Sequence, residues 1–265
     1  MKKNLHKAAY PALLCLFLFF LCCLTGCGGT KTSIPYNAGE IVELGQYKGL
    51  TVTKMSAEVT DEEVDIKIEA DLLGMFPEET ELSDELIFEA TGGLYSDLES
   101  YRKDVKEELI REAEEYAKSA MYIDLWEQVV DNSVIRGEIP ADLISQKKET
   151  MRTNALIYAE SYDLTVEEFI NSVLGKTTEE FESEIEEYAL KAAKETLVLK
   201  AIADKEGLNV TKRELDAGID TYVETYGYTS RKDFMETINL DEFEEYILES
   251  KVQEFIADNA VITEE

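Results

Sequence analysis

The residue types that carry most enzyme chemistry are confined to the first 27 residues of this 265-residue chain. The one histidine is His6, and the four cysteines are Cys15, Cys22, Cys23 and Cys27. Without this stretch, the chain cannot form a Ser-His-Asp triad, a Cys-His dyad, a thiol redox centre or an ordinary His/Cys zinc site. Only carboxylate, lysine or tyrosine chemistry remains, or binding without catalysis. We therefore expect no catalytic residue, no metal site and no cofactor.

The start of the chain has the pattern of an export signal. Three lysines and no acid accompany an apolar run from Ala12 to Leu24. This run is shorter than the roughly 20 residues that a transmembrane helix needs. The next residues complete the sequence Leu24-Thr25-Gly26-Cys27, which resembles the bacterial lipobox, whose cysteine is lipidated and becomes the new N-terminus.

We therefore expect residues 1–26 to be a lipoprotein signal peptide and Cys27 to carry the lipid. Residues 27–39 then form a flexible tether, and the protein is anchored on the extracytoplasmic face of the cell membrane. An uncleaved anchor and a plain signal peptide are the alternatives, and either would still export the chain.

Acidic residues dominate the charge of the chain. There are 57 Asp and Glu against 26 Lys and Arg, which gives a net charge of -31. Such a chain is a poor ligand for nucleic acid, so we exclude this class of partner. Runs such as Glu114-Glu115 and Glu179-Glu180 lack the alternating ligands and the turn glycine of a calcium loop. We interpret these runs as solvated helix faces.

Tyrosine is the other prominent residue type, with 14 tyrosines against one tryptophan. Tyrosine offers apolar area and a hydroxyl group without a charge, and methionine adapts its shape to its neighbours. Such side chains can form a surface that holds unfolded polypeptides, and packing inside a helical core is the alternative. The candidate client-binding residues are Met151, Leu156, Tyr158, Phe169, Tyr222 and Tyr226.

Helices must position these residues, and their expected ends are marked by local signals. A capping box, in which Ser or Thr is followed three residues later by Glu, satisfies two backbone N–H groups at a helix start. It occurs at Thr60, Ser96, Thr165, Thr177 and Thr211, with a weaker variant at Ser230 and Asp233. Pro140 favours a further first turn. Left-handed glycine caps are expected at Gly175, Gly207 and Gly227.

Apolar residues recur at spacings of three and four between these signals, which predicts two long helices, over 96–132 and from about 177 to 206. The β-prone flanks of residues 45–49 predict a short hairpin or an extended strap near residues 40–54. The expected fold is mainly all-α: an extended helical body with long helix hairpins, plus this β strap.

Several of these segments resemble the trigger factor family. The stretch Val42-Glu43-Leu44-Gly45-Gln46-Tyr47-Lys48-Gly49, continuing through Val64, resembles the trigger factor linker. The stretches Ile139-Pro140-Ala141-Asp142-Leu143 and Gly175-Lys176-Thr177-Thr178-Glu179-Glu180-Phe181 are similar to its helical C-terminal chaperone domain. The resemblance implies a linker-like segment at 40–73 and a chaperone domain at 94–262, which is also similar to the helical domain of SurA-type foldases.

The chain departs from the family pattern in two places. A ribosome-binding domain is missing, so we expect no ribosome partner. Residues 74–93 are too few for an FKBP-type isomerase domain, and we read them as a linker in its place. The enzyme activity that the resemblance would imply is thus not expected.

Together these features predict a membrane-anchored, extracytoplasmic, ATP-independent holdase chaperone. Its partners would be unfolded or newly exported polypeptides, and the membrane through the lipid on Cys27. One alternative is a residual peptidyl-prolyl isomerase or foldase, which a proline-limited refolding assay would detect. The other is a structural or partner-binding envelope lipoprotein, which would bind one defined partner in fixed stoichiometry.

Overall fold

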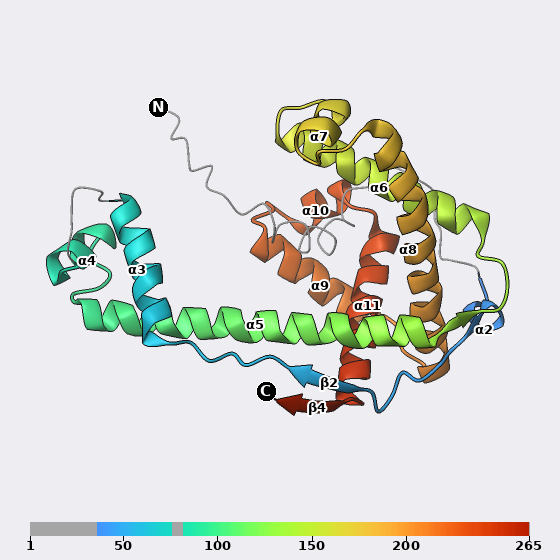
Figure 1. Ribbon diagram of the computed structural model, residues 1–265, viewed down its shortest axis with the longest axis horizontal. Coiled ribbons are helices and arrows are strands. Elements are labelled where there is room, and N and C mark those ends of the chain that lie inside the picture. The colour runs from blue at the N-terminus through green and yellow to red at the C-terminus, as the bar shows by residue number, and fades with distance from the viewer. Residues whose placement is uncertain (1–35, 76–81, 265) are drawn as a thin grey trace. The chain divides into compact units, whose positions relative to one another are not determined.

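The computed structural model describes residues 36–75 and 82–264, and this part of the chain is mainly helical (Figure 1). It divides into two compact units. Unit 1 contains the residues up to Tyr47 and Val129–Phe255, and unit 2 contains Lys48–Gln128 and the residues from Ile256 onward. The prediction of a mainly α fold with a short β segment near residues 40–54 is confirmed.

Unit 1 is built on two neighbouring helices, α6 (Ala141–Ser161) and α8 (Thr178–Glu206). The short helix α7 (Val166–Ser172) lies where the two approach each other at one end (Figure 1). A stripe of small and aliphatic residues on α8 is fully buried, including Ala189, Ala193 and Leu197. Because these residues recur every four positions, they form one face of the helix, which packs against its neighbours.

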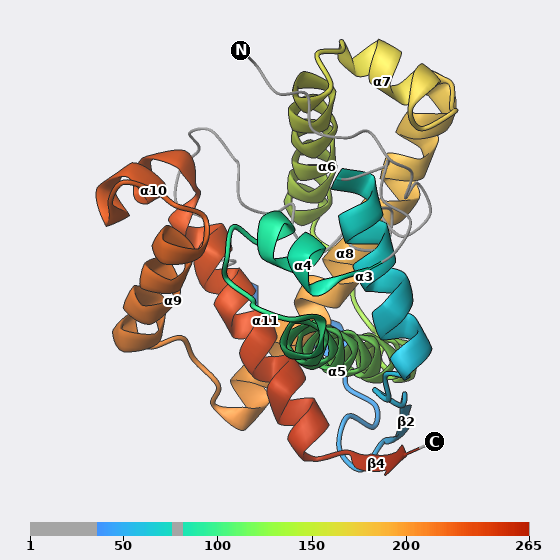
Figure 2. The same cartoon turned by 90° about the vertical axis from the view of Figure 1, so that its left-hand side faces the viewer.

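Three further helices of unit 1 are α9 (Lys212–Thr225), α10 (Arg231–Thr237) and most of α11 (Leu240–Asp258) (Figure 2). They share one apolar core around Ile219, Phe234 and Phe243, with one residue from each helix.

The predicted helix ends are largely confirmed. Reciprocal capping boxes form at Thr60, Thr165, Thr177 and Thr211, each with the Glu three residues later. The side chain of Ser230 accepts from the Asp233 N–H, although the Asp233 carboxylate accepts in turn from Thr229. Gly175, Gly207 and Gly227 are all left-handed, with φ values of 68° or 69°. Gly207 is the C-cap of α8 as predicted, whereas α7 and α9 have Val173 and Tyr226 as their C-cap residues, and the glycines follow these.

Two predicted helix starts are displaced by one or two residues. Helix α5 (Leu98–Asn132) begins after Asp97 instead of Ser96, because the Asp97 carboxylate accepts the Ser100 N–H at 2.8 Å. The Ser96 hydroxyl instead donates to that carboxylate. Pro140 is the residue before α6, and the helix itself starts at Ala141.

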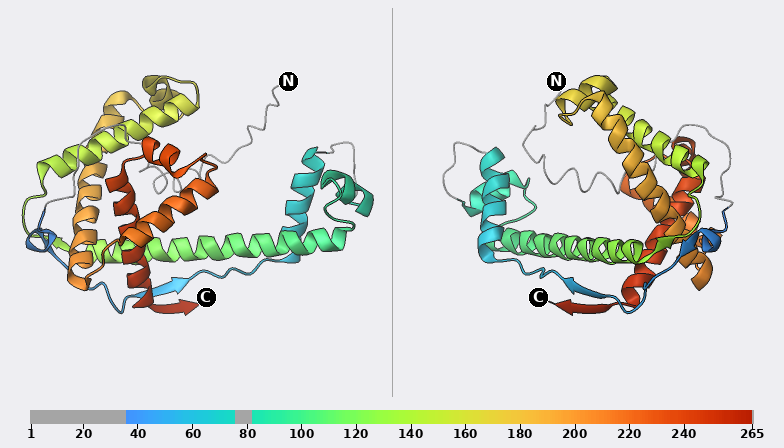
Figure 3. Two further views of the ribbon diagram at one scale, coloured as in Figure 1. Left: turned by 180° about the vertical axis from the view of Figure 1, so that it is seen from behind. Right: turned by 45° about the vertical axis from the view of Figure 1, so that its right-hand side comes forward.

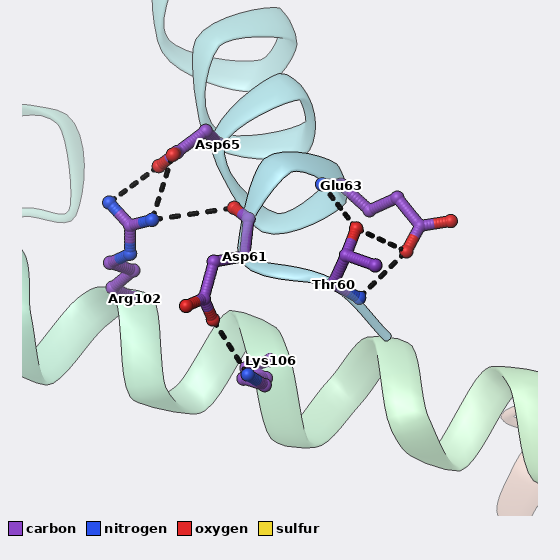
Figure 4. Close-up of polar contacts among 6 residues, drawn as sticks. All are labelled: Thr60, Asp61, Glu63, Asp65, Arg102 and Lys106. Carbon is purple, nitrogen blue, oxygen red and sulfur yellow. Dashed lines mark hydrogen bonds and ion pairs between the residues drawn. The ribbon is translucent and has the colours of Figure 1, made fainter. Parts of the chain in front are cut away.

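Unit 2 packs α3 (Asp61–Met75) and α4 (Asp84–Ala90) at the N-terminal part of α5. Their shared core consists of Val64, Ile68, Leu72, Ile87 and Val105. Ion pairs hold α3 beside α5: an Arg102 nitrogen lies 2.5 Å from the Asp65 carboxylate, and Lys106 donates to Asp61 at 2.7 Å (Figure 4). Four of these core residues come from α3 and α5, so this helix pair is the centre of the unit.

The segment at 40–54 is an extended strap and not a hairpin. Strand β1 (Val42–Glu43) pairs antiparallel with β3 (Val134–Ile135) in unit 1. Strand β2 (Thr51–Lys54) pairs parallel with β4 (Val261–Glu264) in unit 2 (Figure 3). The two ends of the strap therefore pair with distant segments and not with each other.

The predicted domain boundaries stay predictions, and two short helices begin within the predicted tether and linker. Helix α2 (Ala38–Ile41) begins within the predicted tether 27–39, and α4 lies within the predicted linker 74–93. Ser83 caps α4 by accepting the Leu86 N–H. The predicted signal peptide, most of the tether and Cys27 lie outside the described residues, and so does the middle of the linker.

Candidate client-binding surfaces

The predicted client-binding residues all lie in unit 1, in two groups. Helix α6 carries Met151, Leu156 and Tyr158, and α7 carries Phe169. Tyr222 lies on α9, and Tyr226 is the C-cap residue of that helix.

The α6–α7 group is organised around the ring of Phe169. This ring stacks against Tyr158 with centroids 6.3 Å apart, and Tyr162 lies 5.9 Å from it. Phe169 is only 6% exposed, whereas Tyr162 is 49% and Leu156 45% exposed. Phe169 is thus the buried ring against which its neighbours pack. The accessible apolar area of this group comes from α6 and the turn that follows it. Met151 and Tyr158 are half-buried.

The turn between α6 and α7 has a defined local cause. Asp163 has a φ of 56°, in the left-handed region that Asp tolerates better than most residues. The capping box of Thr165 and Glu168 then starts α7. The backbone and side chain of Thr165 both donate to Glu168, and these bonds hold the pKa of that carboxyl below its usual value. The rings are therefore positioned by a turn with several local hydrogen bonds.

The second group surrounds Tyr222. Its ring lies 5.2 Å from Tyr226, 5.8 Å from Phe234 and 5.1 Å from Phe243 between centroids. Tyr222 is half-buried within this cluster, and Tyr226 is 51% exposed. Aromatic clusters of this kind combine a fixed position with a large apolar area.

Several accessible apolar residues of unit 1 were not among the predicted site residues. They are Tyr162, Val173, Tyr188, Leu190, Met235 and Leu240. Tyr188 and Leu190 could have been found, because they flank Ala189 and fall outside the i, i+4 stripe of buried residues on α8. The others carry no such signal, since exposed and buried positions share the same residue types.

Charged side chains connect the two long helices of unit 1. Arg152 donates two hydrogen bonds to Glu182, and Lys148 donates to Glu186 at 2.6 Å. The Arg152 guanidinium lowers the pKa of Glu182. Within residues 36–75 and 82–264, no group of three or more His, Cys, Asp or Glu side chains converges as a metal ion would require.

A protein-family comparison matches residues 97–258 to the bacterial trigger factor protein C-terminus. The trigger factor of Halothermothrix orenii is 33% identical over 143 residues, which is 54% of this chain and 32% of that protein. The trigger factor of Carboxydothermus hydrogenoformans is 28% identical over 169 residues, covering 63% of this chain and 38% of its own length. The chain thus spans about a third of the length of these curated relatives.

A solved structure described as "Promiscuous Substrate Recognition in Folding and Assembly Activities of the Trigger Factor Chaperone" is 19% identical, with a TM-score of 0.39. The match covers 68% of this chain and 43% of the solved chain.

The predicted location on the extracytoplasmic face of the membrane is contradicted by these comparisons. The matched relatives are named trigger factor, a cytoplasmic ribosome-associated chaperone. Within the described part of the chain, no helix combines the length and the apolar character needed to cross a bilayer. The lipid on Cys27 stays a prediction, since that residue is not described.

The family match is consistent with the helix pattern. The matched region starts at the beginning of α5 and ends at the last residue of α11. By its match over more than half of its length, this chain belongs to the family of the bacterial trigger factor C-terminus.

Proposed function

We propose that this chain is an ATP-independent holdase that binds unfolded polypeptides through apolar side chains on the helices of unit 1. The observation that carries the proposal is the accessible apolar area at α6 and α9, where Leu156, Tyr162 and Tyr226 are each close to half exposed. These residues lie in a domain whose family is named for a chaperone.

The binding would rest on many weak contacts. Complete burial of one large apolar side chain contributes about 1.5–3 kcal/mol, and a half-exposed residue retains only part of this for a client. Several such residues on different helices are therefore needed. This arrangement favours binding many unrelated sequences, since each contact requires only apolar area and no fixed hydrogen-bond pattern.

The acidic surface gives the proposal a second component. A net charge of -31 limits self-association of exposed apolar surfaces and attracts basic polypeptide segments. We therefore expect clients in which basic residues lie near apolar ones. Raising the salt concentration by about 300 mM should weaken their binding, because salt screens exposed charges. Tighter binding in salt would contradict this electrostatic component.

The test is aggregation of a chemically unfolded model protein diluted into buffer with residues 28–265 and no ATP. Suppression near an equimolar ratio is expected. The variant Leu156→Ser with Tyr162→Ser, and the variant Tyr226→Ser with Met235→Ser, should each need about fivefold more chaperone, because each loses about 1 kcal/mol of contact. Glu160→Ser is the matched control, because it is an exposed residue on α6 that removes no apolar area.

Two outcomes would contradict the proposal. One is no suppression by a protein whose circular dichroism verifies that it is folded and helical. The other is equal suppression by the control and by both double variants. A proline-limited refolding assay on the same samples would detect isomerase activity, the alternative function.

A further inference from the structure

An unusual set of carboxyl groups lies where α11 meets α6 and α8. Glu245 and Glu249 are one turn apart on α11. Lys147 of α6 donates to Glu245 at 3.4 Å, and the buried Thr196 of α8 donates to the same oxygen at 3.2 Å. Glu245 is therefore the direct connection between the three helices.

Within the described part of the chain, no Lys or Arg forms an ion pair with Glu249 in this junction. Its carboxyl accepts a hydrogen bond from the buried Gln253 side chain at 3.2 Å. The charged groups that face it are Glu245 on its own helix, Glu195 of α8 and Lys147 of α6. Two carboxylates thus oppose its ionisation and one ammonium group favours it, and that ammonium group is already bonded to Glu245.

The surroundings raise the pKa of two carboxyl groups in this junction, and that of Glu249 reaches the neutral range. Burial first, and the Glu245 carboxylate second, raise the pKa of Glu249 to about 7. Burial also raises the pKa of Glu242, one turn before Glu245 on α11. Lys147 opposes both shifts without cancelling them.

We infer that this junction is a pH-dependent latch, which holds α11 against α6 and α8 while Glu249 is protonated and loosens when Glu249 ionises. The protonated carboxyl is neutral, so the junction then contains the Lys147–Glu245 pair without a further buried negative charge beside it. Ionisation adds a charge close to two other carboxylates, in a place where water cannot solvate it fully.

The sign and size follow from proton linkage. The latched state binds a proton more tightly than the opened state, where the carboxyl has its ordinary pKa of 4.5. The latched state is therefore most stable below that value and becomes less stable as pH rises. Above about 7 the loss of stability is complete. Between about pH 6 and about pH 8, the equilibrium constant for opening should rise about tenfold.

Opening would move one candidate client-binding surface relative to the other. The aromatic cluster around Tyr222 includes Phe243 of α11, whereas Leu156 and Tyr162 belong to the α6–α7 group. A change in client binding with pH is a consequence that rests on the proposed holdase function. The latch itself does not depend on it.

The experiment is hydrogen–deuterium exchange of the full chain, with protection factors of residues 243–252 corrected for intrinsic exchange at each pH. In the unmodified protein, protection should fall about tenfold between about pH 6 and about pH 8. Glu249→Gln should abolish most of this fall, because the amide is neutral at both pH values. Glu254→Gln, a change of an exposed carboxyl group on the same helix, should leave the fall intact.

A second variant covers the case in which Glu249→Gln fails to form α11. Lys147→Met removes the one cation that faces Glu249 among the described residues, so the fall in protection should move to higher pH. The latch would be wrong if protection in the unmodified protein did not change, if Glu249→Gln retained the full pH dependence, or if the midpoint in Lys147→Met moved down.

Holdase assays at the two pH values separate this inference from the proposed function. Exchange that follows the latch pattern, together with no holdase activity at either pH, would leave the latch intact and overturn the proposed function. Holdase activity together with pH-independent exchange would do the reverse.

Discussion

A methyl group added at Gly45 would collide with the end of α5, which makes Gly45→Ala the sharpest test of how the strap is held. An ideal Cβ at Gly45 lies 2.1 Å from the backbone oxygen of Asn132 and 2.7 Å from its carbonyl carbon. Ordinary contacts begin at 3.4 Å, so the strap must retreat by more than about 1 Å. That movement would break the 3.1 Å bond from the Asn132 side chain to the Gln46 carbonyl.

The expected cost can be estimated from these two effects. Overpacking against a backbone group costs about 1–3 kcal/mol, and the lost hydrogen bond adds about 1 kcal/mol. Alanine has a lower chain entropy than glycine in the unfolded state, which offsets about 0.4–1 kcal/mol of this cost. We therefore expect the free energy of unfolding to fall by about 1–3.5 kcal/mol, a large share of the stability of a typical domain.

The assay is urea unfolding followed by circular dichroism, with Gly137→Ala as the control. Gly137 lies near the same strap, but its nearest contact is the Ile41 Cα at 3.7 Å, so a methyl group fits there. The control should change the free energy of unfolding by less than about 1 kcal/mol. A loss below about 0.5 kcal/mol for Gly45→Ala would refute the reasoning, since the strap would then adjust without cost.

Two further predictions concern helix ends. Thr177→Ala removes the Thr side chain from the capping box with Glu180 and should lower the free energy of unfolding by about 1 kcal/mol. In the same urea titration the control Thr178→Ala, at the first residue of α8, should cost less than half of this. The Lys251 ammonium group, followed by bonds from Thr211, lowers the pKa of Glu214 from 4.5 to about 2, so this carboxylate stabilises the fold above pH 4.5 and the contribution is lost as pH falls toward 2. Lys251→Met should flatten the acid side of a stability-against-pH curve, and an unchanged curve would contradict the assignment.

The sequence by itself determined where most helices begin and end. A capping box involves residues three positions apart, so Thr165, Thr177 and Thr211 identify their helix starts without any tertiary contact. The glycine C-caps are equally local, because only the missing Cβ makes a left-handed residue inexpensive. Where two local caps competed, at Ser96 and Asp97, the pattern alone did not select the one that accepts the Ser100 N–H.

The client-binding role of the candidate residues stays a prediction. In the structure Leu156 and Tyr226 are accessible, and the rings of Tyr158 and Phe169 lie together. The sequence did not distinguish the buried Phe169 from its exposed neighbours. Phenylalanine and tyrosine occur on the buried and on the exposed face of an amphipathic helix. Whether such a ring is buried depends on which other helix packs against it.

Only the tertiary structure decided the partners of the strap and the charge state of the α11 junction. Thr51 pairs with Val261, and the residues of a β-prone segment do not indicate which distant segment it pairs with. Glu249 looks like any other surface acid in the sequence, and its raised pKa arises from burial and from a carboxylate one turn away. Helix ends depend on nearby residues and can be read from the sequence, whereas strand pairing, burial and pKa depend on distances that exist only after folding.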